Sequence, residues 1–71
     1  MEWQELKEDK NISKEALKRV IYICKKEERK GNEIEVFMQT DNSVYIKITS
    51  EDEEYDYEVD TDGSYSDSRG V

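Results

Sequence analysis

The stretch from residue 51 to residue 62 reads EDEEYDYEVDTD, and its pattern decides how the chain is expected to fold. Its apolar residues, Tyr55, Tyr57 and Val59, stand at every second position. This is the period of a β-strand with one face in a core and the other face in water. The wet face of such a strand carries four carboxylates in a row: Glu54, Asp56, Glu58 and Asp60.

Charge is unevenly distributed along the seventy-one residues, whose net charge at pH 7 is −8. Residues 1–50 hold ten acidic and ten basic residues, whereas residues 51–71 hold nine acidic residues and a single base, Arg69. A negative field confined to one end of the chain repels nucleic acids and anionic membranes and attracts basic surfaces. We therefore expect no direct binding of nucleic acid and no membrane association.

Residues 14–30 have the pattern of an amphipathic helix. Its apolar stripe consists of Leu17, Val20, Ile21 and Cys24, with Ala16 and Ile23 beside it. Ser13 suits the N-cap position because its hydroxyl can accept a hydrogen bond from a free backbone N–H. Gly31 suits the position after the last helical turn. Upstream, Trp3 and Leu6 are spaced to share one face of a short helical turn that packs on the domain.

Two further alternating stretches, residues 33–40 and 43–50, predict a first hairpin. Turn-forming residues occupy positions 41–43 between them. A three-residue loop at these positions pairs Met38 with Ile46 and keeps the apolar side chains of both strands on one face. We therefore expect this register.

A second hairpin follows through a two-residue loop at Glu51 and Asp52. This loop aligns three apolar pairs: Ile48 with Tyr55, Ile46 with Tyr57 and Val44 with Val59. On the other face it sets Lys47 opposite Asp56, a pair of opposite charge that favours the same register. Because Glu51 and Asp52 rarely form the usual two-residue turns, the type of turn is left open.

Residues 61–63 predict a third hairpin loop, with Gly63 in the left-handed conformation and Tyr65 opposite Val59. A short fourth strand then covers about residues 64–67. The fold class is thus α+β, with one helix packed on a three- or four-stranded antiparallel meander sheet. We expect residues 1–71 to form a single small domain, with residues 1–10 and 66–71 loosely ordered.

The sheet face opposite the helix is expected to be open to a partner. It combines the acidic run with two aromatic side chains that could anchor a contact. The candidate partner-binding residues are Glu51, Asp52, Glu53, Glu54, Asp56, Glu58, Asp60, Asp62, Phe37 and Tyr45.

Nothing in the sequence indicates catalysis or a cofactor. The chain has no His to activate a nucleophile, and its three glycines are scattered rather than gathered in a phosphate loop. Its one cysteine, Cys24, excludes an intramolecular disulfide and suits a buried position. Residues 58–64 place acids and Gly63 as an EF-hand loop does, but Arg69 stands where that loop needs a bidentate Glu. We expect no enzyme, no cofactor and no metal site.

Alternate carboxylates on a strand lie about 6.6–7 Å apart, the same order as the ~3.4 Å rise between phosphates along one nucleic-acid strand. In size and charge, though not in any motif, the chain is similar to the small acidic inhibitors that phages encode, such as anti-CRISPR and anti-restriction proteins. This likeness implies a nucleic-acid mimic that occupies the basic site of a nuclease or CRISPR effector. The N-terminal residues lack the pattern of a signal peptide, so we expect a cytoplasmic location.

Two alternatives remain open. The chain could be a generic interaction module or subunit that assembles, even as a homodimer, through the open sheet face or an edge strand. The second alternative is direct nucleic-acid binding by the helix, which the negative net charge opposes. It would use Lys14, Lys18, Lys25, Lys26, Arg29 and Lys30.

Overall fold

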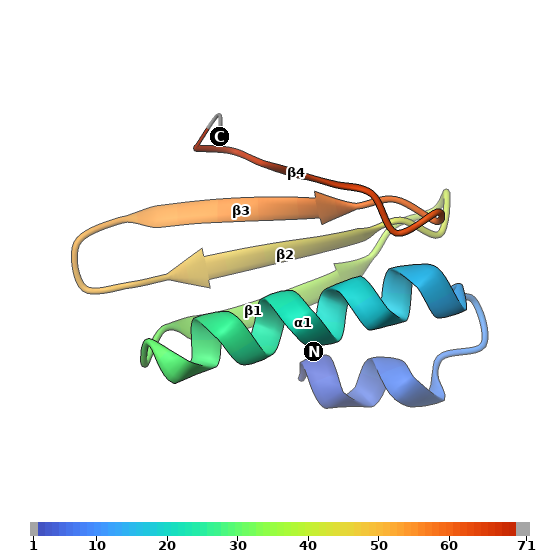
Figure 1. Cartoon of the computed structure of the whole chain (residues 1–71), viewed down its shortest axis with the longest axis horizontal. Helices are drawn as coiled ribbons and strands as arrows, with labels where there is room; N and C mark the ends of the chain where they lie inside the picture. Colours follow the sequence, from blue (N-terminus) through green and yellow to red (C-terminus); the bar gives the residue numbers. More distant parts are fainter. Residues whose placement is uncertain (1, 70–71) are drawn as a thin grey trace.

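The computed structural model of the chain describes residues 2–69. One antiparallel sheet with strand order β1-β2-β3-β4 packs against a helix (Figure 1), which confirms the predicted α+β meander. The elements are η1 (Trp3–Glu8), α1 (Lys14–Arg29), β1 (Glu33–Met38), β2 (Val44–Thr49), β3 (Glu54–Val59) and β4 (Tyr65–Asp67). The looser order expected for the two ends of the chain stays a prediction, and Met1, Gly70 and Val71 lie outside the described residues.

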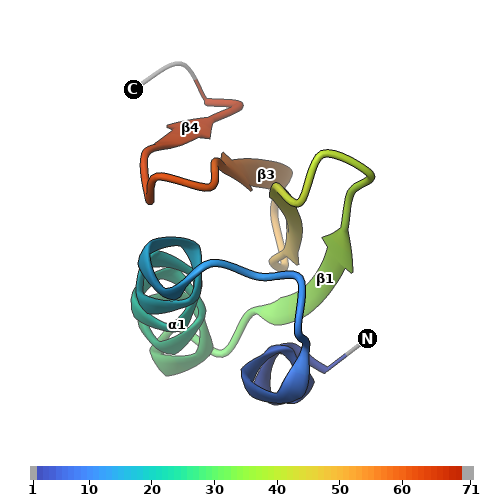
Figure 2. The same ribbon diagram turned by 90° about the vertical axis from the view of Figure 1, so that its right-hand side faces the viewer.

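The molecule has two layers. Seen from its end in Figure 2, the sheet curves around α1, and η1 lies beside α1 next to β1. The core between the layers consists of Trp3, Leu6, Ala16, Val20, Ile23, Cys24, Val36, Val44, Ile46, Ile48, Tyr55, Tyr57 and Val59. The helical turn predicted for Trp3 and Leu6 is confirmed, and both side chains are buried. None of the described helices and strands covers the outer face of the sheet, as the alternating pattern predicted.

Helix α1 begins as expected, because the Ser13 Oγ accepts a hydrogen bond from the Ala16 N–H at 3.1 Å. Its buried stripe differs from the predicted one. The fully buried residues are Ala16, Val20, Ile23, Cys24 and Glu27, whereas Leu17 and Ile21 are only partly buried. The side of the helix that faces the sheet therefore includes Glu27, whose carboxylate accepts hydrogen bonds from tyrosine hydroxyls of β3.

The predicted register of the first hairpin is wrong by two residues, because Met38 lies opposite Val44 rather than Ile46. The loop does have three residues between hydrogen-bonded ends, but these are residues 40–42. Asn42 occupies the last loop position with φ 69°, a left-handed conformation that Asn tolerates better than most residues. Since the shift is an even number of residues, the same side chains still face the core.

The other two hairpins confirm their predicted registers. The three apolar pairs between β2 and β3 are as expected, and the backbone N–H of Ser50 donates to the carbonyl of Glu53 at 2.9 Å across the two-residue loop. In the third hairpin Gly63 has φ 87°, and Tyr65 lies opposite Val59. The strands that carry the acidic run are thus held in a single defined alignment.

Candidate protein-binding face

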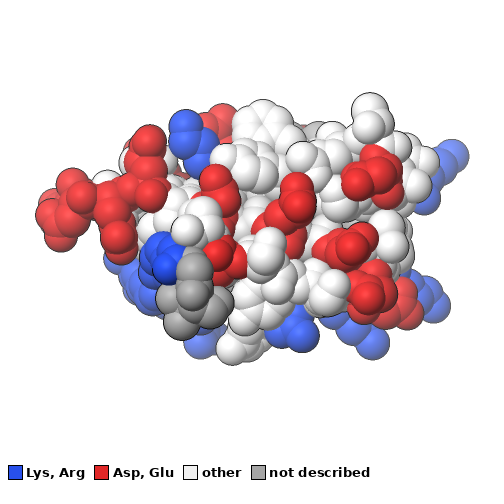
Figure 3. All heavy atoms as spheres, turned by 90° about the horizontal axis from the view of Figure 1, so that it is seen from above, with Lys and Arg blue, Asp and Glu red and all other residues white. Residues whose placement is uncertain are grey.

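The outer side of β3 carries a row of carboxylates that continues into the hairpin tip. We define the acidic face as Glu51, Asp52, Glu53, Glu54, Asp56, Glu58 and Asp60. All of these side chains are exposed except that of Asp56, which is half-buried. Figure 3 views the molecule from above, over β3 and β4, and shows Asp and Glu gathered across this surface, with most Lys and Arg around its margin. The face is therefore a concentrated negative surface on a rigid sheet.

Three of these carboxylates have partners among the described residues, and one of them is Asp60, which accepts a hydrogen bond from the Thr61 N–H at 2.8 Å. The Tyr45 hydroxyl donates to Asp56 at 2.9 Å, and this bond to an anion raises the pKa of Tyr45. Lys47 Nζ lies 3.9 Å from a carboxylate oxygen of Glu54, with both side chains well exposed. Such an exposed pair contributes little to stability. Glu58 makes no ion pair with the described residues, and it keeps its charge available.

An aromatic pair lies beside the acids. The rings of Phe37 and Tyr45 are 6.0 Å apart between centroids, and Phe37 is 44% exposed. A half-exposed phenylalanine next to a row of charges can supply apolar contact area that the acids lack. The structure therefore brings together the two kinds of candidate residue that the sequence predicted for this face.

Asp62 lies apart from the acidic face. It belongs to the β3–β4 loop and lines a groove against α1, together with Lys18 and Arg19. Its carboxylate accepts hydrogen bonds from the N–H and hydroxyl of Ser64, at 2.9 and 2.6 Å, and these bonds lower the pKa of Asp62. Asp62 therefore stabilises its own loop and does not belong to the predicted row of carboxylates.

The loops at this end of the sheet share a motif that the sequence reasoning missed. Residues 40–43 read TDNS and residues 61–64 read TDGS. In the first loop Asp41 accepts from the N–H and hydroxyl of Ser43, at 3.0 and 2.5 Å, as Asp62 does in the second. These bonds lower the pKa of Asp41 as well. Both carboxylates are thus structural components of matching turns.

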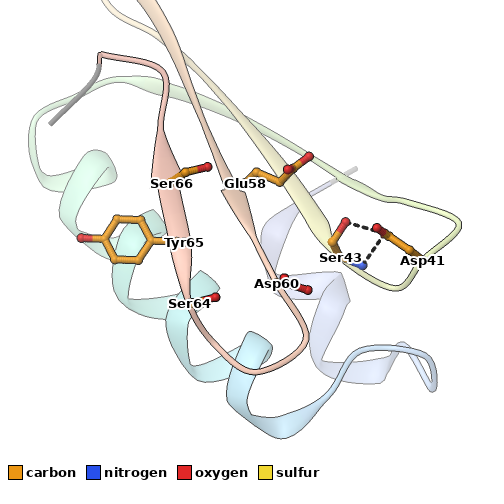
Figure 4. Close-up of a pocket in the computed structure, with 7 residues that line it drawn as sticks. All are labelled: Asp41, Ser43, Glu58, Asp60, Ser64, Tyr65 and Ser66. Atoms are coloured by element: carbon orange, nitrogen blue, oxygen red, sulfur yellow. Dashed lines mark hydrogen bonds between the residues drawn. The ribbon is translucent and has the colours of Figure 1, made fainter.

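A hollow of about 280 Å³ lies between the two loops (Figure 4). It is lined by Asp41, Ser43, Glu58, Asp60, Ser64, Tyr65 and Ser66. Figure 4 shows the ring of Tyr65 on the opposite side of β4 from Asp41 and Ser43. Within residues 2–69 no group of three or more acids, His or Cys is arranged to hold a metal ion. The segment that imitates an EF-hand loop forms part of a hairpin instead.

The sequence also gave no sign of a buried acid behind the sheet. Glu27 is completely buried, and its carboxylate accepts hydrogen bonds from the hydroxyls of Tyr55 and Tyr57 at 2.5 and 2.6 Å. The side-chain amide of Asn32 donates a third bond at 2.9 Å. Burial by itself raises the pKa of Glu27, but the three hydrogen bonds outweigh it and hold the pKa below its usual value.

Arg69 packs against the same tyrosines. Arg69 lies with its guanidinium carbon 3.8 Å from the centroid of the Tyr55 ring and donates to the Tyr57 hydroxyl at 3.2 Å. An ion pair of 2.8 Å joins Arg69 to Asp67 and lowers the pKa of Asp67. Strand β3, which carries the acidic face, is therefore fixed from behind by Glu27 and at its edge by Arg69.

Comparisons with protein-family models, curated proteins and solved structures find no match to this chain. Among the residues that the structure describes, no helix is long and apolar enough to cross a membrane. We therefore infer the function from the surface of this chain alone.

Proposed function

We propose that this protein is a cytoplasmic inhibitor that mimics nucleic acid and occupies the basic nucleic-acid site of an enzyme such as a nuclease or CRISPR effector. The observation that carries the proposal is the outer face of the sheet, where all charged side chains but one are negative. Among the described residues that point outward from the four strands, Lys47 is the only base. A basic channel meeting this face would find acids at half of these outward positions and a base at one of them.

The regular spacing and fixed positions of the acidic residues support the same proposal. Alternate residues along β3 are spaced by about 6.6–7 Å, and neighbouring strands by about 4.8 Å. Glu54, Asp56 and Glu58 sit on a strand that pairs with β2 along its whole length and with β4 at residues 57–59, so their backbone positions are fixed before any partner arrives. Preorganised charges lose little freedom on binding and steer a basic partner toward the face.

The test is a pull-down from bacterial lysate with the tagged protein at low and high salt, with and without competitor DNA. We expect a basic nucleic-acid enzyme that is released by salt and by DNA. The triple variant Glu54→Gln, Glu58→Gln, Asp60→Asn removes three charges from the face and should lose this capture. The variant Glu2→Gln, Glu5→Gln, Glu8→Gln removes the same charge at η1 and should retain it.

The proposal fails if no basic nucleic-acid enzyme is captured, or if the face variant captures it as well as the unaltered protein does. Loss of capture in both variants alike would also contradict it, because net charge rather than the face would then control binding.

A second candidate function is a subunit or interaction module that assembles through the outer face. The observation that favours it is the exposed Phe37 beside Tyr45, since apolar contacts resist salt. In the same pull-down this function predicts a partner that stays bound at high salt and is lost in Phe37→Ser.

A further inference from the structure

A second charged surface lies on the opposite side of the molecule from the acidic face, where α1 passes beside β4. We define the α1–β4 patch as Lys18, Arg19, Tyr22, Lys26 and Tyr65. Two of the three large aromatic side chains that are well exposed belong to it: Tyr22 is 57% and Tyr65 is 45% exposed. Basic and aromatic side chains therefore alternate over a surface that neither η1 nor the sheet covers.

Arg19 is the best positioned of these bases. Its guanidinium carbon lies 4.9 Å from the ring centroid of Tyr65 and 5.9 Å from that of Tyr22. Its Nε donates to the carbonyl of Gly63 at 3.1 Å. Within residues 2–69 its two terminal amino groups make no hydrogen bond or ion pair. Arg19 thus keeps a pair of donors for a ligand, and such a pair can bind a carboxylate in a bidentate manner.

The surroundings of Arg19 form a shallow groove of about 410 Å³. It is lined by Glu15, Lys18, Arg19, Tyr22, Asp62 and Gly63. Asp62 directs its carboxylate to Ser64, so Glu15 is the acid in this lining that no hydrogen bond within the described residues engages. Further along α1, Lys26 adds a positive charge 5.9 Å from the centroid of Tyr22. The lining holds two bases and two acids, so Lys26 beside it gives this part of the surface a small excess of positive charge although the whole chain is negative.

We propose that the α1–β4 patch binds the acidic β2–β3 hairpin tip of a second copy of this chain. The tip, residues 51–54, carries four consecutive carboxylates, and all four are exposed. It extends from one end of the sheet in Figure 1, and a narrow hairpin fits a shallow groove better than a flat face does. Arg19 and Lys18 complement its charge, and the hydroxyls of Tyr22 and Tyr65 can donate to its carboxylates.

The overall negative charge does not prevent this contact. At physiological ionic strength, charges more than about 8 Å apart are largely screened, so the pairs at the interface outweigh the repulsion between distant acids. Tyr and Arg are also the residue types that contribute most to binding at protein interfaces. The association is then weak, electrostatic and sensitive to salt.

Self-association would regulate the proposed inhibitor, because the hairpin tip belongs to the acidic face. A tip bound in the groove of another copy cannot enter the basic site of an enzyme, so dilution would favour the active form. This consequence rests on the proposed function. The association itself does not, and it is measured without any partner enzyme.

The experiment is sedimentation velocity over a concentration series with charge-reversed variants. The patch variant is Lys18→Glu with Arg19→Glu, and the tip variant is Glu51→Lys with Asp52→Lys. We expect the unaltered chain to show a rising weight-average mass, and each variant alone to lose this rise. An equimolar mixture of the two variants should regain it, since the reversed tip then meets the reversed patch.

Two controls keep the result interpretable. Lys7→Glu with Lys10→Glu changes the same charge away from the patch and should associate as the unaltered chain does. Lys18→Glu with Tyr22→Ser keeps the contacts of Arg19 with Tyr65 and Gly63, and should also lose association if the double reversal fails to fold. A monomeric unaltered chain, a patch variant that still associates, or a mixture that regains nothing would overturn the proposal. Binding of a single-stranded oligonucleotide at the patch in place of self-association would overturn it as well.

Discussion

At the scale of single residues, Glu27 is a completely buried acid held by three hydrogen bonds. A buried carboxylate is tolerated only when hydrogen bonds replace the water it has lost. Tyr55 and Tyr57 supply such bonds, and burial followed by the bond to Glu27 raises the pKa of Tyr55 to about 12. At neutral pH both hydroxyls are therefore protonated donors, and Glu27 is ionised.

We expect Glu27→Gln to lower the free energy of unfolding by about 1–3 kcal/mol, because an amide places a donor where a tyrosine hydroxyl also donates. The effect should depend on pH. The folded-state pKa of Glu27 is lowered from the usual 4.5, so its ionised form adds stability above pH 4.5 that is lost as the pH falls through the lowered pKa. Urea unfolding at pH 7 and at successively lower pH measures the difference, with the exposed Glu35→Gln as control. A difference that persists unchanged in strong acid would contradict this account.

At the scale of secondary-structure elements, two turns of similar sequence were predicted with different success. Gly63 identified the left-handed position of the third hairpin, because glycine has no Cβ to oppose it. Asn42 plays the same part in the first hairpin, but alternation alone cannot distinguish registers that differ by two residues. Comparing TDNS with TDGS would have placed both loops correctly.

The same limits apply to the candidate site. A period of two predicted which residues share the outer face, and the structure confirms that Phe37, Tyr45 and the β3 acids lie together there. In the sequence, Glu27 resembles an ordinary polar residue near the end of a helix. No pattern within one element reveals that tyrosine hydroxyls of β3 donate hydrogen bonds to it. The α1–β4 patch was missed for a similar reason, because Tyr65 and Arg19 meet only through tertiary packing.

The two left-handed positions should respond differently to substitution. A Cβ at Gly63 would lie 3.1 Å from the carbonyl oxygen of Glu15, in addition to the strain of φ 87°. We expect Gly63→Ala to cost about 1–2 kcal/mol or more in urea unfolding. Asn42→Gly relieves a strained position and should change stability by less than about 0.5 kcal/mol. Equal losses in the two variants would show that the matching turns do not determine stability in this way.

At the scale of the whole molecule, charge is separated between two sides. Acids crowd the outer side of β3, and the basic residues of α1 lie behind the sheet. Like charges held close together oppose folding, and they do so most at low ionic strength. The acidic face should therefore reduce stability while it favours contact with a basic partner.

This conflict can be measured with the variant Glu54→Gln, Glu58→Gln, Asp60→Asn. We expect its thermal midpoint to exceed that of the unaltered chain by about 2–6 °C in low salt, because three mutually repelling charges are removed. The gain should shrink when salt is raised to several hundred millimolar. The η1 variant Glu2→Gln, Glu5→Gln, Glu8→Gln should gain less, since its acids lie outside the crowded face. A lower midpoint in the face variant would mean that these carboxylates stabilise the fold. A higher midpoint combined with lost capture would show that the charges which weaken the fold are the ones that bind the partner.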